Sequence, residues 1–165
     1  VIAMGDCAIN IKPSEDELVE IAGEASKCAK IFGVDPQVAF LSYSTHGSGK
    51  GEDVDKMCNA ARKAKEKYPD LPIDGELQFD AAVSPRVART KCPDSNVAGH
   101  ANTFIFPDIN AGNIGYKIAQ RMGNFEAYGP ILLGLNAPVN DLSRGCNASE
   151  VYSMAIITAA LANNI

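Results

Sequence analysis

Short apolar runs alternate with longer segments that predict helices along the whole of this 165-residue sequence. The apolar runs predict β-strands over residues 1–9, 38–43, 72–78, 102–106 and 131–135. Helices are predicted over residues 15–32, 52–68, 81–91, 111–122 and 148–162, and the first of them carries its apolar residues on one helical face. Repeated strand–helix alternation indicates βαβ units. We therefore expect an α/β fold with a mostly parallel sheet that helices cover on both faces.

Specific residues mark the ends of several predicted helices. Ser14, with Glu17 three positions later, forms a capping-box pattern at the start of the first helix. Gly33 is typical of a residue that ends a helix. The second helix opens with acidic residues and closes with basic ones, an order that suits the helix dipole. Pro85 predicts an irregularity within the third helix.

Four loops follow the predicted strands, over residues 44–51, 77–80, 107–115 and 136–146. They are the most polar and glycine-rich parts of the chain. In open parallel sheets, ligands bind beyond the carboxyl ends of the strands. We therefore expect the functional residues to lie in these loops.

The loop at 44–51 is rich in glycine and precedes a helix, which suggests a phosphate-binding P-loop. The Walker A pattern fails, because Ser44 stands where glycine is required and Gly51 where Ser or Thr is required. Backbone N–H groups at the helix start would still suit an anion. The alternative is a tight turn that joins strand and helix. In the same way, His46 and Lys50 are either solvated loop residues or catalysts.

The segment 107–115 holds two asparagines and two glycines between a strand and a helix. An asparagine can cap the helix, and a glycine lets a ligand come close to the backbone. Asn110 as the N-cap would explain one asparagine and leave the rest of the run unexplained.

The loop 136–146 places Ser143 and Arg144 just before the last predicted helix. A guanidinium beside the positive end of a helix suits a phosphate or a carboxylate, and the Ser143 hydroxyl is a donor for an oxyanion. Glu150 lies on the first turn of that helix. With Asn147 as N-cap it forms a capping box, a role that is compatible with catalysis. We interpret Cys146 as a small packing residue.

Composition excludes several classes of function. The net charge of −5 argues against nucleic acid as a partner, since that role calls for a basic face. No apolar run reaches the roughly 20 residues that span a bilayer. Five isolated cysteines and two distant histidines suggest neither a zinc site nor a disulfide framework, and they fit a reduced, cytoplasmic setting. Because the chain opens on an apolar run without Met, we expect further protein upstream of Val1.

Seven ordered motifs resemble signatures of the phosphate acetyl/butyryltransferase family, and the likeness runs from Val1 almost to Ile165. The motifs lie at residues 6–8, 41–45, 49–51, 74–78, 105–108, 110–117 and 138–145. Together they are far more specific than any single motif.

The resemblance implies a two-domain enzyme about twice this length, with its catalytic cleft between the domains. Residues 1–145 would form the second domain, and residues 146–165 a C-terminal helix that packs on the first domain. The implied fold is a three-layer α/β/α sandwich of the isocitrate/isopropylmalate dehydrogenase type. Members of the family usually form homodimers through the second domain.

The resemblance also assigns site residues. Ser143 and Arg144 match active-site residues of the family, and Glu150 stands where the family has an aspartate as the proposed base. The substitution keeps the carboxylate but lengthens the arm by one methylene, roughly 1.5 Å, a scale at which catalytic geometry is sensitive. We expect further contacts with coenzyme A or phosphate from Gly49, Lys50, Asn113, Tyr116, Lys117 and Asn140.

The implied reaction is reversible acetyl transfer between acetyl-CoA and inorganic phosphate, giving acetyl phosphate and coenzyme A. Coenzyme A is a substrate, and the reaction needs no metal and no bound cofactor. Two alternatives remain open: a phosphate butyryltransferase, or an acyl-CoA-sensing regulatory domain of a malic-enzyme type. A dinucleotide-dependent dehydrogenase is disfavoured because no GxGxxG follows a strand.

Overall fold

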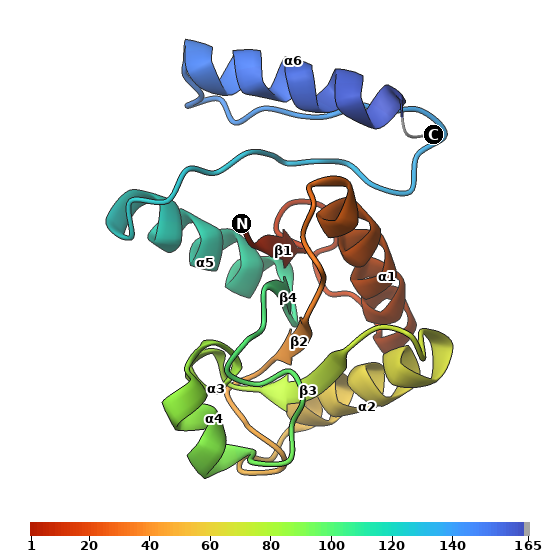
Figure 1. The fold of residues 1–165 in the computed structure, drawn as a ribbon, viewed down its shortest axis with the longest axis vertical. Coiled ribbons are helices and arrows are strands. Elements are labelled where there is room, and N and C mark those ends of the chain that lie inside the picture. Colours follow the sequence, from red (N-terminus) through yellow and green to blue (C-terminus); the bar gives the residue numbers. More distant parts are fainter. Residues whose placement is uncertain (164–165) are drawn as a thin grey trace. The chain divides into compact units, whose positions relative to one another are not determined.

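The structure is a computed structural model and describes residues 1–163 (Figure 1). The chain divides into two compact units, of which the first spans Val1–Ile114 and the second begins at Gly115. The division falls within one helix, α5, which runs over Ile109–Met122.

The first unit is built on a four-stranded parallel sheet. The strands are β1 (Ala3–Gly5), β2 (Val38–Leu41), β3 (Ile73–Leu77) and β4 (Thr103–Ile105). Their order in the sheet is β1-β4-β2-β3, and every pairing is parallel. In the register, Thr103 lies opposite both Ala3 and Val38, so the last strand fits between the first two. The predicted parallel sheet is confirmed.

Two long helices, α1 (Glu15–Ile31) and α2 (Glu52–Lys67), cover one face of the sheet. Alternate residues of β2, Val38 and Phe40, point to this face and pack with Leu18 of α1 and Met57 of α2. All four side chains are fully buried. Every second residue of the strand therefore packs against the apolar faces of the two helices.

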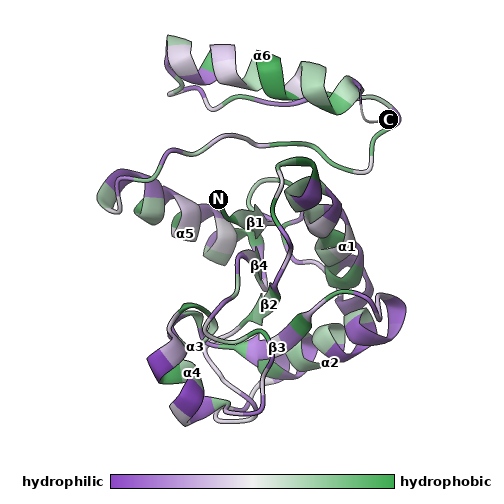
Figure 2. Cartoon of the chain, in the orientation of Figure 1, coloured by the Kyte–Doolittle hydropathy of each residue, from purple (hydrophilic) through white to green (hydrophobic). Residues whose placement is uncertain are grey.

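The other face of the sheet is covered by α3 (Phe79–Val83), α4 (Pro85–Lys91) and the segment 97–101. Ala39 and Leu41, which alternate with the β2 residues of the first face, belong to this second core with Phe104. The first unit thus has three layers. Figure 2 shows many hydrophilic residues on α2 and α4, as expected for helices with one face toward the sheet and one toward solvent.

The predicted ends of the first helix are confirmed. Ser14 and Glu17 form a complete capping box, in which Glu17 Oε2 accepts the Ser14 N–H at 2.7 Å and Ser14 Oγ accepts the Glu17 N–H at 3.3 Å. Gly33 follows the helix with a φ of 72°, a left-handed conformation that glycine adopts without steric cost.

The predicted helix over 81–91 is instead two short helices. The chain breaks at Ser84, whose hydroxyl accepts the Val87 N–H at 3.5 Å and caps α4. Pro85 occupies the first position of α4, where its missing N–H is not needed. Proline thus starts a new helix here and does not merely bend one.

The first predicted strand, 1–9, is shorter than expected and ends at Gly5. The carboxylate of Asp6 accepts three successive backbone N–H groups, from Ala8, Ile9 and Asn10. These bonds fold the chain back on itself, and they also lower the pKa of Asp6 although burial would raise it.

The second unit consists of the end of α5, an extended segment, and α6 (Ala148–Ala162). The strand predicted over 131–135 is wrong, since only one antiparallel bridge, between Ile131 and Asn140, forms there. The N–H of Leu132 bonds to a side chain, and Gly134 has a φ of 74°, so no ladder continues. The last two residues of the predicted segment 146–165 lie outside the described residues.

None of the helices in residues 1–163 combines the length and the apolar character that a membrane span requires.

Candidate active site

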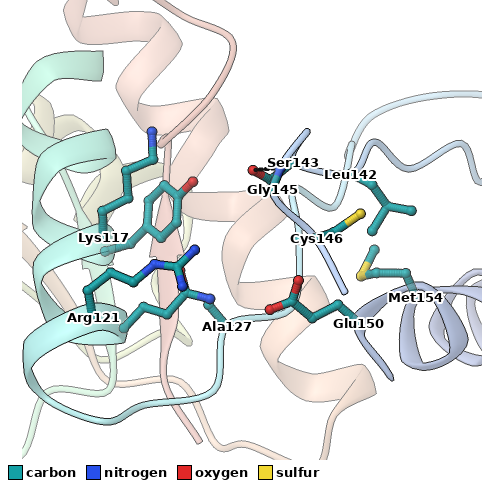
Figure 3. Close-up of a pocket in the computed structure, with 12 residues that line it drawn as sticks. Lys117, Arg121, Ala127, Leu142, Ser143, Gly145, Cys146, Glu150 and Met154 are labelled. Carbon is teal, nitrogen blue, oxygen red and sulfur yellow. Dashed lines mark hydrogen bonds between the residues drawn. The ribbon is translucent and has the colours of Figure 1, made fainter. Parts of the chain in front are cut away.

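A cavity of about 140 Å³ lies in the second unit (Figure 3). Its walls come from the last turns of α5, from residues 127–129, from the loop 142–146 and from the first turns of α6. The lining residues are Tyr116, Lys117, Gln120, Arg121, Ala127, Gly129, Leu142, Ser143, Gly145, Cys146, Glu150 and Met154.

One helical face of α5 supplies the basic wall of the cavity. Residues 116, 117, 120 and 121 share this face because three and four residues complete a helical turn. Lys117 Nζ lies 5.6 Å from the centre of the Tyr116 ring, a cation–π arrangement. Arg121 adds a second cation one turn further along, and Figure 3 shows its guanidinium directed to the side where Glu150 lies. This wall attracts anions.

The loop that carries Ser143 forms a tight turn at the opposite wall. The Cys146 N–H donates to the Ser143 carbonyl at 2.9 Å, and the Gly145 N–H donates to Ser143 Oγ at 3.3 Å. Both bonds stay within the turn and leave the hydroxyl proton of Ser143 available as a donor.

Asn140 fixes this loop to its neighbours. Its Oδ1 accepts the Leu132 N–H at 3.1 Å, and its Nδ2 donates to Thr158 Oγ1 on α6 at 2.8 Å. The Thr158 hydroxyl in turn donates to the Met154 carbonyl at 2.7 Å. Asn140 therefore joins the extended segment and α6 to the start of the serine loop, and it does not line the cavity.

Glu150 both caps α6 and lines the cavity. Its Oε2 accepts the Asn147 N–H at 3.0 Å, while Asn147 Oδ1 accepts the Glu150 N–H at 2.9 Å, so the predicted capping box is confirmed. The same side chain lines the cavity. The cap uses one carboxylate oxygen and holds the group at the cavity wall, where the second oxygen can meet a ligand.

Arg144 is exposed and lies outside the lining of the cavity. Within residues 1–163 no ion pair or hydrogen bond holds its guanidinium. Its side chain is therefore free to rotate on the turn that Ser143 begins.

A second hollow, a groove of about 480 Å³, lies in the first unit at the carboxyl ends of β2 and β3. Its lining residues are His46, Gly47, Gly49, Lys50, Gly51, Val54, Asp55, Cys58, Gly75 and Glu76. Gly49 and Lys50, two predicted ligand contacts, therefore belong to this groove. Burial, together with the charges of Glu76 and Asp55, raises the pKa of the Cys58 thiol.

Asn113 has a structural contact. Its Nδ2 donates to the Cys7 carbonyl at 3.0 Å and ties α5 to the segment after β1. At Gly112, a Cβ atom would lie 2.3 Å from the Asp6 carbonyl oxygen, so only glycine allows this close approach. Asp108, rather than Asn110, caps the helix, because its Oδ1 accepts the Ala111 N–H at 3.0 Å. Contacts within the protein thus account for much of this asparagine- and glycine-rich run.

The structure brings four of the nine predicted site residues to one cavity: Tyr116, Lys117, Ser143 and Glu150. Sequence reasoning missed Gln120 and Arg121. The signal was present, since Arg121 follows Lys117 by four residues on a predicted helix. From the sequence, Cys146 was interpreted as a small packing residue. In the structure this half-buried thiol lines the cavity.

The residues that the structure describes contain no group of three or more His, Cys, Asp or Glu side chains placed to hold a metal ion. All five cysteines are free thiols. Burial, reinforced by the charge of Asp6, raises the pKa of Cys7 to about 12, so this thiol stays protonated at neutral pH. The chemistry available in the cavity is that of two cations, an aliphatic and a phenolic hydroxyl, an amide, a thiol and a carboxylate.

These observations define a parallel α/β protein whose second unit carries a cavity suited to an anionic ligand. The model of the family described as "Phosphate acetyl/butaryl transferase" matches residues 1–159. The chain therefore belongs to the phosphate acetyl/butaryl transferase family.

Relatives and solved structures agree with this assignment. The chain is 61% identical to a phosphate acetyltransferase of Bacillus subtilis (strain 168), over 95% of this chain and 49% of the relative. It is 58% identical to a phosphate acetyltransferase of Corynebacterium glutamicum, over 95% of this chain and 48% of the relative. A crystal structure of a phosphotransacetylase from Streptococcus pyogenes is similar with a TM-score of 0.93 and 61% identity, covering 97% of this chain and 49% of that one. The chain thus spans about half the length of the relatives that it matches.

Proposed function

We propose that this chain is part of a phosphate acetyltransferase, which moves an acetyl group reversibly between coenzyme A and inorganic phosphate. The observation that carries the proposal is the cavity of the second unit. There a hydroxyl (Ser143), a carboxylate (Glu150) and two cations (Lys117 and Arg121) surround one space. The high identity to phosphate acetyltransferases over nearly the whole chain supports the same reaction.

In the proposed reaction, the thiol of coenzyme A loses its proton to Glu150. A free thiol has a pKa of about 8.5, and the thiolate is the attacking species, so a nearby base raises its concentration at neutral pH. The sulfur then bonds to the carbonyl carbon of acetyl phosphate. The bond from that carbon to the phosphate oxygen breaks, and phosphate leaves with the electron pair.

Charge develops on two oxygens in this step. The Ser143 hydroxyl donates to the carbonyl oxygen as it becomes an oxyanion. Lys117 and Arg121 neutralise the phosphate, and Arg144, which is free to rotate on the same turn as Ser143, reaches it as a further cation. Neither step requires a metal or a bound cofactor, and the reverse reaction uses the same groups.

The capping box gives Glu150 its orientation. Because the Asn147 N–H holds Oε2, the side chain loses most of its rotational freedom before a ligand binds. This restraint offsets the longer arm of glutamate relative to the aspartate that family resemblance implies at this position.

The remaining predicted residues divide into two groups. We assign Tyr116 and Lys117 to the cavity wall, and Gly49 and Lys50 to a coenzyme A contact through the groove of the first unit. Asn113 and Asn140 act through the protein, since the contacts of their side-chain amides hold α5 and the serine loop in place.

Three further features follow from the family resemblance. We propose a fold class of the isocitrate/isopropylmalate dehydrogenase type, a second domain over residues 1–145 with a C-terminal helix at 146–165 that packs on a first domain, and a homodimer. The parallel sheet with helices on both faces supports the fold class.

The test is an assay of the full-length protein that contains this chain, with coenzyme A and a panel of acetyl, propionyl and butyryl phosphates. We expect thioester formation, fastest with acetyl phosphate, and release of inorganic phosphate in equal amount. Ser143→Ala should lower kcat at least about tenfold. No thioester from any acyl phosphate, or wild-type kcat in Ser143→Ala, would overturn the proposal.

A further inference from the structure

Glu76 is a carboxylate in the interior of the first unit. Only 2% of the residue is exposed, and it lies on β3 next to Leu77, which belongs to the second core. The register explains its place: Phe40 pairs with Gly75 and Leu41 with Leu77, so Glu76 is the extra residue of a β-bulge. A bulge at the end of a buried strand turns one side chain out of the regular alternation.

Glycine at position 75 makes the bulge possible. Its φ is 159°, and a Cβ atom there would lie 2.6 Å from Phe40 Cβ. Any other side chain would push β3 away from β2. The local backbone is thus suited to carry Glu76 in this orientation.

The Glu76 side chain holds the loop 44–51 through a single oxygen. Oε1 accepts the Ser44 hydroxyl at 2.7 Å and the Gly47 N–H at 2.7 Å. The backbone carbonyl of Glu76 accepts a third bond, from the His46 N–H at 3.1 Å. One residue of β3 therefore receives three bonds from three residues of the loop, Ser44, His46 and Gly47.

Ser44 connects Glu76 to the backbone of Gly49 by hydrogen bonds. The Ser44 side chain is fully buried, and its Oγ, which donates to Glu76, accepts the Gly49 N–H at 2.8 Å. Gly49 precedes Lys50, and both line the groove that we assign to coenzyme A, as do Gly47 and part of Glu76 itself. Glu76 therefore reaches the groove-lining backbone through one hydrogen bond at Gly47 and through two at Gly49.

Burial of an anion among neutral donors is unfavourable unless its hydrogen bonds are well made. Within residues 1–163, no ion pair neutralises Glu76. Packing alone does not require a buried carboxylate at this position, since an apolar side chain would fill the same space without a desolvation cost. We propose that Glu76 is a positioning residue for coenzyme A: it holds the loop 44–51 in the shape in which Gly49 and Lys50 contact the ligand. The inference rests on the proposed function.

Two substitutions separate the acceptor from the carboxylate charge. Glu76→Gln keeps an oxygen at Oε1 and so keeps both bonds from the loop, whereas Glu76→Ala removes them. We expect Glu76→Ala to raise the Kd and the KM for coenzyme A about tenfold, the loss of roughly one to two hydrogen bonds, with kcat within about threefold of wild type. Glu76→Gln should stay within about threefold of wild type in all three values. The KM for acetyl phosphate should not change.

The measurements use the full-length protein: calorimetric binding of coenzyme A, steady-state kinetics, and hydrogen–deuterium exchange of peptides covering 44–51. Exchange in this loop should increase in Glu76→Ala and not in Glu76→Gln, while peptides of α1 keep their protection. Glu66→Ala, at an exposed position of α2, is the matched control. An unchanged Kd and unchanged loop exchange in Glu76→Ala would overturn the proposal. Equal damage in Glu76→Gln would also overturn it, because the acceptor alone would then be insufficient.

Ser44→Ala provides a second test of the proposal, which applies even if the Glu76→Ala variant does not fold. It leaves Glu76 in place and removes the acceptor for the Gly49 N–H, so the Kd for coenzyme A should rise about three- to tenfold. An unchanged Kd would overturn the proposal. If the wild-type protein binds coenzyme A but forms no thioester, the proposed reaction fails while the binding and exchange data still decide the role of Glu76.

Discussion

Asn140 donates from its side-chain amide to the hydroxyl of Thr158 over 2.8 Å and thereby ties the start of the serine loop to the middle of α6. The same amide accepts the Leu132 N–H through its oxygen. The position of Ser143 in the cavity thus depends on a residue outside the cavity lining.

Replacement of this amide should affect both stability and turnover. Asn140→Ala removes two hydrogen bonds in the second unit, so we expect a loss of about 1–3 kcal/mol in the free energy of unfolding and a fall in kcat of at least about tenfold through displacement of Ser143. Thermal melting and steady-state kinetics of the full-length protein measure the two effects. Asn110→Ala, at an exposed position of α5, is the control. Unchanged melting and kcat in Asn140→Ala would contradict this role.

Arg121 is the cation that sequence reasoning did not select. Arg121→Ala removes a phosphate-attracting charge from the cavity wall, and we expect the KM for acetyl phosphate and for inorganic phosphate to rise about tenfold. Arg121→Lys should recover part of the loss because it restores the charge without the planar fork. Arg89→Ala, at an exposed position of α4, should behave as wild type. Saturation curves in both directions of the reaction provide the measurement, and an unchanged KM for both phosphates would remove Arg121 from the site.

The cap and base roles of Glu150 can be separated in one substitution. Glutamine serves as well as glutamate in a capping box, so Glu150→Gln should change the melting temperature very little. It removes the proton acceptor, and we expect kcat to fall about 10²- to 10⁴-fold. Glu150→Asp restores a carboxylate and should regain much of the rate. The comparison is the kcat and its pH profile in the three proteins; a wild-type profile in Glu150→Gln would reduce Glu150 to a helix cap.

Asp74 should make the first unit sensitive to acid. Burial would raise its pKa, but hydrogen bonds from Ser95, Lys65 and the Gly75 N–H, with the charge of Lys65, lower it below its usual value. A carboxyl group whose pKa is lower in the folded state stabilises the fold above its unfolded pKa, and this contribution is lost as the pH falls through the folded pKa. We therefore expect the free energy of unfolding to fall from about pH 5 downward, through the unfolded pKa near 3.9.

Denaturant unfolding across this pH range checks the prediction. Asp74→Asn should flatten the pH dependence and lower stability at neutral pH by about 2–3 kcal/mol, because Lys65 loses its anionic partner and the neutral donors lose a charged acceptor. Asp70→Asn, at an exposed position after α2, should leave the curve unchanged. An identical pH dependence in Asp74→Asn and wild type would show that Asp74 does not cause the loss of stability at low pH.

Gly112 should tolerate no side chain despite its place in a helix. Alanine is the better helix former by up to about 1 kcal/mol, but its Cβ would approach the backbone oxygen of Asp6 to 2.3 Å and the Cα of Cys7 to 3.2 Å. Because both are backbone atoms, the clash moves α5 and outweighs the propensity gain, with a net loss of about 1–3 kcal/mol. The denaturant midpoint of Gly112→Ala, compared with Asn110→Ala on the same helix, is the measurement. Equal or greater stability would mean that α5 shifts without cost.

Prediction from sequence worked where the decisive interactions are local. Ser14 with Glu17, and Asn147 with Glu150, are three residues apart, and the capping boxes that they predict are present. The apolar run of β2, the apolar face of α1 and the charge order of α2 likewise depend on neighbours in sequence. The family motifs pointed to Ser143 and Glu150, which meet in one cavity.

Prediction failed where a residue finds its partner far along the chain. The apolar run at 131–135 has the composition of a strand, but the N–H of Leu132 bonds to the Asn140 side chain and no neighbouring strand accepts the segment. The protein contacts of Asn113 and Asn140 were likewise not predicted: their amides bond to Cys7 and to Thr158, 106 and 18 residues away. No local pattern contains those partners.

The sequence by itself determined the parallel α/β architecture, the helix caps and the membership of the motifs in one family. Each of these depends on the order and spacing of residues. Only the tertiary structure decided that Arg121 shares a cavity with Ser143 and Glu150, that Gly49 and Lys50 line a different hollow, and that the buried carboxylate of Glu76 holds their loop. The physical reason is that hydrogen bonds and charge interactions act over a few ångströms in space, and folding alone selects which distant residues come within that range.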